Sequence, residues 1–261
     1  MNAVELSILG PALLAGLLVL STHVPLGYEV LRRGIIFIDL AVAQVAGLGV
    51  MAADAMGWEP SGWAVQVAAI SAALFASFIL NWTGKRWPEI QEALIGVCFI
   101  MAATAGVLLL AGNPHGGENL RELLVGQILW VTPGQLVPVA VLYLCIVPIW
   151  ILYRDRLLGF GFYAIFAFAV TASVQLVGVY LVFASLIVPA LATRHVVSRR
   201  TRLISGYILG AAGFLLGLLA STWWDLPSGA VIAWCLVGSA IFFAWIIEPM
   251  LTTRGTANSA A

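Results

Sequence analysis

The sequence predicts an all-α protein, a polytopic helical membrane bundle of about eight to nine transmembrane helices. Three observations predict this class. Hydrophobic residues make up 62% of the 261 residues and charged residues only 9%, against about 25% charged in a soluble domain. The basic residues are clustered, and the stretches between the clusters are apolar over about 20 residues or multiples of that length. Lipid-facing backbone must satisfy its own hydrogen bonds, so we expect these stretches to be helices within a single transmembrane domain, residues 1–261.

The expected spans follow from the apolar stretches taken in order along the chain. We place them near 6–31, 34–56, 62–82, 90–112, 134–153, 158–176, 178–193, 203–221 and 229–248. The difficult pair lies in residues 158–193, which carry no charge and are too long for one span and short for two. Gly178 marks the expected break between them. This segment is therefore expected to form two spans or a re-entrant hairpin.

The orientation follows from the distribution of basic residues, which are enriched in cytoplasmic loops. An outside N-terminus puts nearly all basic groups in the cytoplasm and leaves only Arg121 outside. The cytoplasmic groups are then those at Arg32, Lys85, Arg154, Arg194–Arg202 and Arg254. The sequence thus predicts a multi-pass protein of the cytoplasmic (inner) membrane with its N-terminus outside and its C-terminus inside.

Residues 113–133 are too polar for a span, and their leucines recur at near-helical spacing between charged residues. This pattern predicts an amphipathic helix against the outer membrane face. A packed loop helix without a function of its own is the first interpretation, and a gate or docking surface is the second.

Two GxxxG pairs lie in the span 203–221, at Gly206 and Gly210 and at Gly213 and Gly217. Glycine at this spacing lets two membrane helices approach closely. We interpret both pairs as packing features.

No polar stretch is long enough for a soluble catalytic or nucleotide-binding domain. The sequence has no P-loop, no HExxH and no nucleophile-elbow pattern. We therefore expect no enzyme activity, no permanently bound cofactor and no nucleic-acid partner. A helical bundle of this kind is expected to be a transporter or a transporter subunit.

Two stretches carry a family resemblance. One runs from Ser173 to Ala192 and contains the sequence VGVYLV, and the other is Asp225–Ala230, with the sequence DLPSGA. Both resemble the second half of the zinc/manganese importer permeases of the ATP-binding-cassette class. Gln91–Gly96 and the Leu31–Arg33 triplet are similar to other motifs of this family, and the resemblance runs in order over nearly the whole chain.

The resemblance implies a permease subunit of an ATP-driven importer, with a divalent metal ion, zinc or manganese, as its cargo. Its implied partners are a cytoplasmic ATP-hydrolysing subunit, an extracytoplasmic metal-binding protein, a second permease copy and the lipid bilayer. An ATPase-independent secondary transporter is one alternative, although we find no internal repeat of the kind such transporters often show. A non-transporting assembly protein on a permease scaffold is the other.

The chain departs from the family pattern in two places. The family's second span carries an Asp and a His four residues apart as the expected metal ligands. Here the His position is Gln44 and the Asp position is Leu40, with Asp39 one place away, and glutamine is a poor zinc ligand. The family's cytoplasmic segment for docking the ATPase is also shortened, to Asp155–Gly159.

The candidate metal site comes from the depth of ionisable residues in the first two spans. His23 lies about 12 Å from the cytoplasmic end of the first span, while Asp39 and Gln44 lie about 8 Å and about 15 Å into the second. His23, Asp39 and Gln44 are therefore the predicted metal contacts. In the alternative interpretation, His23 is a packed core histidine that hydrogen-bonds Asp39. Glu29 is explained by ion pairs with Arg32 and Arg33, within one turn of the same helix.

Overall fold

The computed structural model describes residues 3–58, 62–113, 116–153, 156–157 and 159–247. Throughout these ranges the regular structure is helical, without a strand, which confirms the predicted fold class. The helices are α1 (Ala3–Arg33), α2 (Ile38–Ala55), α3 (Trp63–Arg86), α4 (Gln91–Leu110), α5 (Gly116–Val125), α6 (Pro133–Tyr153), α7 (Phe160–Val177), α8 (Val179–Ala192), α9 (Arg199–Trp224) and α10 (Ser228–Phe242). Short helical turns are η1 (Pro88–Ile90), η2 (Ile128–Trp130) and η3 (Phe243–Ile247).

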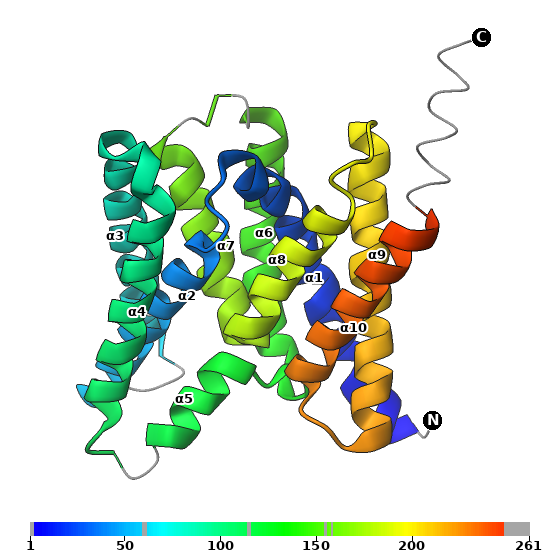
Figure 1. Ribbon diagram of the computed structural model, residues 1–261. Coiled ribbons are helices and arrows are strands. Elements are labelled where there is room, and N and C mark those ends of the chain that lie inside the picture. Colours follow the sequence, from blue (N-terminus) through cyan, green and yellow to red (C-terminus); the bar gives the residue numbers. More distant parts are fainter. Residues whose placement is uncertain (1–2, 59–61, 114–115, 154–155, 158, 248–261) are drawn as a thin grey trace.

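Eight of the helices in the described ranges are long and apolar enough to cross a membrane. They are all the helices except α5 and α8 (Figure 1). Helix α8 is apolar but has only 14 residues, about 21 Å at 1.5 Å per residue and short of the bilayer core. The structure thus has eight full-length spans and one short apolar helix, at the lower bound of the predicted number.

Residues 158–193 form two helices, α7 and α8, as the sequence predicts. The break lies at Gly178, whose φ of 81° is in the left-handed region that favours glycine. Helix α7 runs away from the basic end of the bundle and α8 runs back toward it (Figure 1). The segment is therefore a helical hairpin, and its two ends lie on the same side of the bundle.

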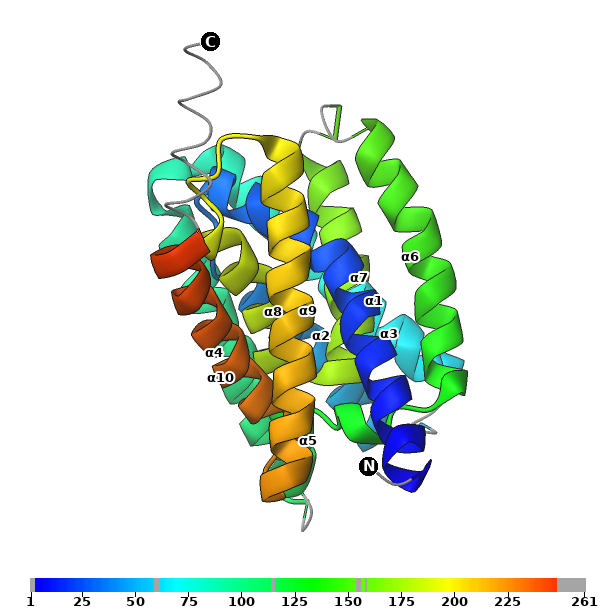
Figure 2. The ribbon, with the colours of Figure 1, turned by 90° about the vertical axis from the view of Figure 1, so that its right-hand side faces the viewer.

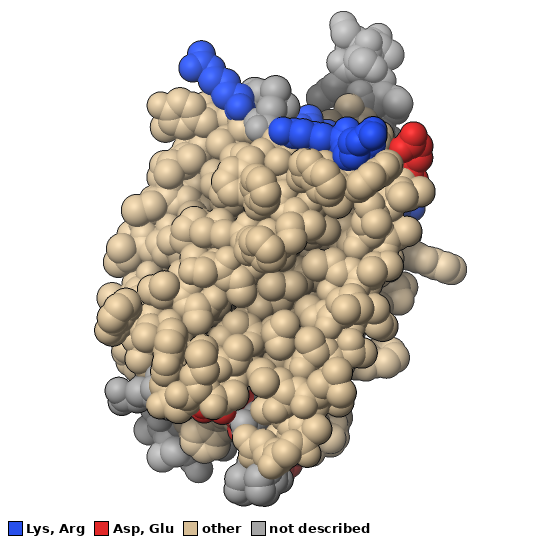
Figure 3. Space-filling view, turned by 90° about the vertical axis from the view of Figure 1, so that its left-hand side faces the viewer, with Lys and Arg blue, Asp and Glu red and all other residues tan. Residues whose placement is uncertain are grey.

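The charged side chains are divided between the two ends of the bundle. On the face shown in Figure 3, Lys and Arg gather at one end, where acidic side chains also lie, and the coloured charged residues seen at the opposite end are acidic. Helix α1 begins and α10 ends at opposite ends of the bundle (Figure 1). This arrangement fits the predicted orientation, although Arg154, Asp155 and Arg254 lie outside the described residues.

Helix α9 packs closely between α1 and α10, and its glycines allow this approach. A Cβ at Gly210 would meet the Leu20 side chain of α1, and a Cβ at Gly213 would lie 2.6 Å from the Leu236 side chain of α10. These separations leave no room for a larger residue. The packing interpretation of the GxxxG pairs is therefore confirmed, and Figure 2 shows α1 beside α9.

Helix α5 covers the end of the bundle that lies opposite the basic end (Figure 1). Its charged residues Glu118, Arg121 and Glu122 are exposed, while Leu123 and Leu124 are half-buried. This confirms an amphipathic helix that is not a span. The helix is followed by Gly126, whose φ is 73° and whose Cα lies against the backbone at Gly178. The C-terminal end of α5 therefore packs on the α7–α8 break.

Candidate functional site

The first predicted contact, His23, lies fully buried on α1. Its Nδ1 is 3.0 Å from the Val19 carbonyl oxygen of the preceding turn. A carbonyl oxygen only accepts, so this contact places the imidazole proton on Nδ1. Nε2 lies 3.1 Å from the hydroxyl oxygen of Ser173 on α7. When Ser173 donates to Nε2, His23 is a neutral imidazole that joins α1 to α7.

The Ser173 hydroxyl has a single proton but lies within hydrogen-bond distance of three possible acceptor atoms. Its hydroxyl oxygen lies 2.8 Å from the Ala169 carbonyl and 3.0 Å from the Val170 carbonyl, in addition to His23. A hydroxyl donates only one hydrogen bond. When Ser173 donates to its own helix, the Nε2 lone pair of His23 is free for another partner.

Tyr143 brings α6 to the same cluster. It is buried, and its hydroxyl donates to the Ala169 carbonyl at 2.8 Å. The hydroxyl also lies beside those of Thr22 and Ser173 and within electrostatic range of the Asp39 carboxyl. Polar groups from α1, α2, α6 and α7 thus meet in the core of the bundle.

Asp39, in the first turn of α2, is fully buried. Neither of its carboxylate oxygens has a hydrogen-bond partner among the described residues. An unpaired buried acceptor costs about 1–3 kcal/mol, and a charged one costs more. A carboxyl group in this setting is stabilised by a proton, a water molecule or a cation that comes to it.

Gln44 lies on α2 beyond Asp39 and is 2% exposed. Its carbonyl oxygen Oε1 is buried and, within the described part of the chain, accepts no hydrogen bond. The predicted contacts therefore include three buried oxygen atoms to which no described residue donates, two from Asp39 and one from Gln44. Carboxylate and carbonyl oxygens are ligands that suit hard divalent ions such as Mn²⁺.

The structure changes one part of the predicted site. The hydrogen bond between His23 and Asp39, considered as a structural alternative, is not formed, because His23 bonds Ser173 and Asp39 has no partner. Within the described ranges no group of three or more His, Cys, Asp or Glu residues lies close enough to hold a metal ion. The metal role of His23, Asp39 and Gln44 stays a prediction.

Sequence reasoning missed Tyr143 and Ser173. Tyr143 lies in the middle of the largely apolar helix α6, and a buried tyrosine hydroxyl usually has a partner. That rule could have marked Tyr143 as part of a polar cluster. Nothing in the local pattern around Ser173 indicates that it faces His23, which is 150 residues away in the chain.

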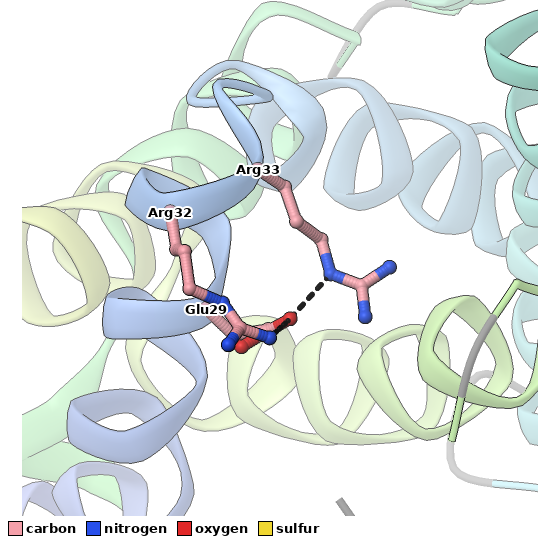
Figure 4. Close-up of polar contacts among 3 residues, drawn as sticks. All are labelled: Glu29, Arg32 and Arg33. Carbon is pink, nitrogen blue, oxygen red and sulfur yellow. Dashed lines mark hydrogen bonds and ion pairs between the residues drawn. The ribbon is translucent and has the colours of Figure 1, made fainter. Parts of the chain in front are cut away.

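The ion pairs predicted for Glu29 are present at the basic end of α1 (Figure 4). Glu29 Oε1 lies 2.7 Å from Arg32 Nη2 and 2.6 Å from Arg33 Nε. The Arg33 guanidinium also lies 4.1 Å from the centroid of the Phe162 ring on α7. Glu29 is therefore paired within its own helix and is not available to the buried site.

A helical membrane bundle with polar and ionisable groups buried in its core is the arrangement of a membrane transport protein. The sequence profile of the ABC 3 transport family matches residues 5–162 and 154–248. The chain belongs to this family of transport proteins, which confirms the resemblance seen in the sequence.

Similar proteins agree with this assignment. The manganese transport system membrane protein MntC of Halalkalibacterium halodurans is 24% identical over 265 residues, covering 93% of this chain and 88% of the relative. A probable metal transport system membrane protein of Chlamydia muridarum is 25% identical over 205 residues, covering 71% of this chain and 70% of the relative. The structure of PsaBC from Streptococcus pneumoniae in complex with Fab has a TM-score of 0.77 at 18% identity, covering 97% of this chain and 98% of that one. The structural likeness shows a shared fold.

Proposed function

We propose that the chain is the membrane-spanning permease subunit of an ATP-driven divalent metal-ion importer in the cytoplasmic (inner) membrane. Residues 1–261 form its single transmembrane domain. A cytoplasmic ATP-hydrolysing subunit, an extracytoplasmic metal-binding protein and a second permease copy complete the transporter. The family assignment and the relatives' names, which include manganese and metal transport, support this proposal.

One observation carries the proposal, namely the buried Asp39 carboxyl group, which has no hydrogen-bond partner among the described residues. A permease needs a place inside the membrane where a cation is stabilised during its passage, and a carboxylate without donors is such a place. The Glu29 carboxylate, by contrast, is already neutralised by two arginines. Of these two acidic side chains on consecutive helices, Asp39 is the one that no described residue neutralises, so it is available to a passing cation.

The cargo follows from the donor atoms. Asp39 and Gln44 offer oxygens, while the imidazole lone pair of His23 is engaged by Ser173. Oxygen ligands suit Mn²⁺, whereas zinc prefers imidazole, thiolate and carboxylate. We therefore propose manganese as the cargo, with zinc as the alternative. His23 would join the ligands when the Ser173 hydroxyl turns to its own helix.

The test is metal uptake by proteoliposomes that contain the chain with its ATPase, supplied with the binding protein and manganese. Asp39→Asn should abolish ATP-dependent uptake, because the amide has no charge to stabilise the cation. The matched control is Asp54→Asn, on the same helix but at its far end. It should leave uptake near the unsubstituted rate.

Three results would contradict the proposal. Normal uptake by Asp39→Asn would remove this carboxylate from the pathway. Uptake driven by an ion gradient without ATPase or ATP would favour the secondary transporter. Absence of uptake in the complete assembly, combined with an assembly defect on deletion of the chain, would favour the non-transporting alternative.

A further inference from the structure

A cavity of about 550 Å³ opens at the basic end of the bundle, between the ends of α1, α6, α8 and α9. Among the described residues, four arginines line it, together with one acidic residue, Glu29. The arginines are Arg32, Arg194, Arg199 and Arg202. This cavity is separate from the buried site, because neither Asp39 nor Gln44 lines it.

The charge of this cavity is not balanced by the residues that line it. Glu29 is already paired with Arg33 as well as Arg32. Across the described chain, no carboxylate lies within ion-pair distance of Arg194, Arg199 or Arg202. Like charges that share a cavity repel one another, and an anion between them removes the repulsion.

Arg202 gives a more specific sign of a missing partner. Its guanidinium lies 5.1 Å from the centroid of the Tyr28 ring, so the ring holds the side chain in place. Its Nε is buried and lacks a hydrogen-bond acceptor in the described structure. A buried guanidinium donor is normally satisfied, and here an acceptor from outside the chain would satisfy it.

The backbone around the cavity is fixed by a polar contact. The Tyr28 hydroxyl donates to the Arg202 carbonyl at 2.8 Å and also contacts the Thr193 hydroxyl. This ties the end of α8 and the start of α9 to α1. Helix α9 begins at Arg199, one of the lining residues, so the positive end of its dipole adds to the charge of the arginines.

The remaining lining side chains are largely apolar, and they indicate the kind of anion. Pro25, Leu31, Trp150, Ala190 and Leu203 form this part of the wall. Pro25 lies seven residues before Arg32 on the same helix, about 10 Å deeper in the membrane at 1.5 Å per residue. A ligand that contacts arginines on one side of the cavity and apolar side chains on the other should be an amphipathic anion, with a charged headgroup and an apolar tail.

We propose that this cavity binds the phosphate group of an anionic phospholipid. Arginine is well suited to phosphate because its planar guanidinium donates two parallel hydrogen bonds. The lipid phosphate would lie between Arg194, Arg199 and Arg202 and would accept from Arg202 Nε. The glycerol and the upper acyl chains would lie against Trp150 and Leu203. A bound lipid would connect the ends of α1, α8 and α9 at the predicted cytoplasmic face.

The experiment is native mass spectrometry of the full-length chain, released from detergent containing either phosphatidylglycerol or phosphatidylcholine. We expect phosphatidylglycerol to be retained in preference to phosphatidylcholine. The Arg194→Gln, Arg199→Gln double variant should lower this retention by about tenfold or more, because each arginine near a membrane surface contributes to anionic-lipid binding. Arg202 is left unchanged because its packing on Tyr28 supports the fold.

The matched control is Arg200→Gln, which changes an exposed arginine of the same helical turn that does not line the cavity. It should retain phosphatidylglycerol as the unsubstituted chain does, and both variants should unfold at the same temperature. Equal losses in both variants would mean general surface attraction and would overturn the proposal.

Two further arms identify the source of the phosphate. Inorganic phosphate that displaces the lipid completely and itself stays bound would show a site for free phosphate and not for lipid. Unchanged lipid retention in the double variant, combined with loss of ATPase co-purification, would make this face a protein-docking surface and would also overturn the proposal. None of these results depends on metal uptake. A failure of the proposed permease function would therefore leave the lipid-binding proposal untouched.

Discussion

The Nε2 atom of His23 lies 3.1 Å from the hydroxyl oxygen of Ser173, and this contact joins the first helix to the seventh. The imidazole is fully buried, and its other nitrogen is engaged by the Val19 carbonyl. The histidine is thus tied to α7, while no described residue donates to the carboxyl group of Asp39 on α2. The two groups predicted to act together have separate physical roles, which variants can distinguish.

His23 and Ser173 should be energetically coupled. Ser173→Ala would leave Nε2 buried without a donor, a cost of about 1–3 kcal/mol. His23→Ala should cost at least as much, because it also leaves a cavity. In a double-mutant cycle measured by thermal unfolding in detergent, the coupling should exceed about 0.5 kcal/mol.

His23→Gln should recover much of the stability that His23→Ala loses, because an amide can still accept from Ser173. Ser185→Ala is the control, since Ser185 is buried and, among the described residues, bonds the Leu181 carbonyl of its own helix. It should show no coupling to His23. Additive effects of the His23 and Ser173 substitutions would contradict the hydrogen bond.

Asp39→Asn should uncouple stability from transport. In the described structure the carboxylate has no partner to lose, so the neutral amide should leave the melting temperature unchanged or raise it. The same variant should abolish metal uptake. A clear loss of stability would show that Asp39 has a structural partner, and would weaken the case for a cation site.

Gln44→His should shift metal preference toward zinc. An imidazole at this position restores the ligand that the family resemblance implies, and zinc favours nitrogen over amide oxygen. We expect preserved or tighter metal binding, with a larger gain for zinc than for manganese, measured by competition between the two ions. The control is Gln91→His, on a buried glutamine that already bonds the Leu80 carbonyl and should not respond. An equal shift in both variants would exclude a role for position 44.

Gly126→Ala should be much more destabilising than Gly57→Ala. Both glycines have a positive φ, 73° and 79°, so each alanine carries a similar backbone strain of about 1–2 kcal/mol. A Cβ at Gly126 would also overlap the backbone of Gly178, whose nitrogen would be 2.6 Å away, whereas Gly57 has open space around it. The difference in unfolding temperature measures how tightly α5 packs on the α7–α8 break. Similar effects would mean that α5 moves away easily.

Cysteines introduced at Arg86 and Arg200 should react with a membrane-impermeant thiol reagent only after the membrane is opened. The prediction follows from the basic residues at one end of the bundle. A cysteine at Arg121, on α5, is the control and should react in intact cells. Labelling of a cysteine at Arg86 or Arg200 from outside would show that the chain has the opposite orientation in the membrane.

The sequence by itself determined the features that depend on near neighbours in the chain. Apolar length places the spans, and a glycine within the over-long apolar stretch 158–193 marks the break at Gly178. Helical spacing predicts the Glu29 ion pairs, because residues three and four apart share a face. The glycine spacing of α9 predicts a close helix contact, although not which helices make it.

Only the tertiary structure decided which buried groups meet. Depth along a span places His23 near Asp39, but the rotation of α1 points the imidazole to Ser173 instead. The four-arginine cavity likewise requires residues from α1, α8 and α9 to converge. In a membrane protein nearly every helix face is apolar, so hydropathy reports how deep a residue lies and not which way it faces. Direction is set by packing between helices that are distant in the chain, and packing follows from the whole bundle.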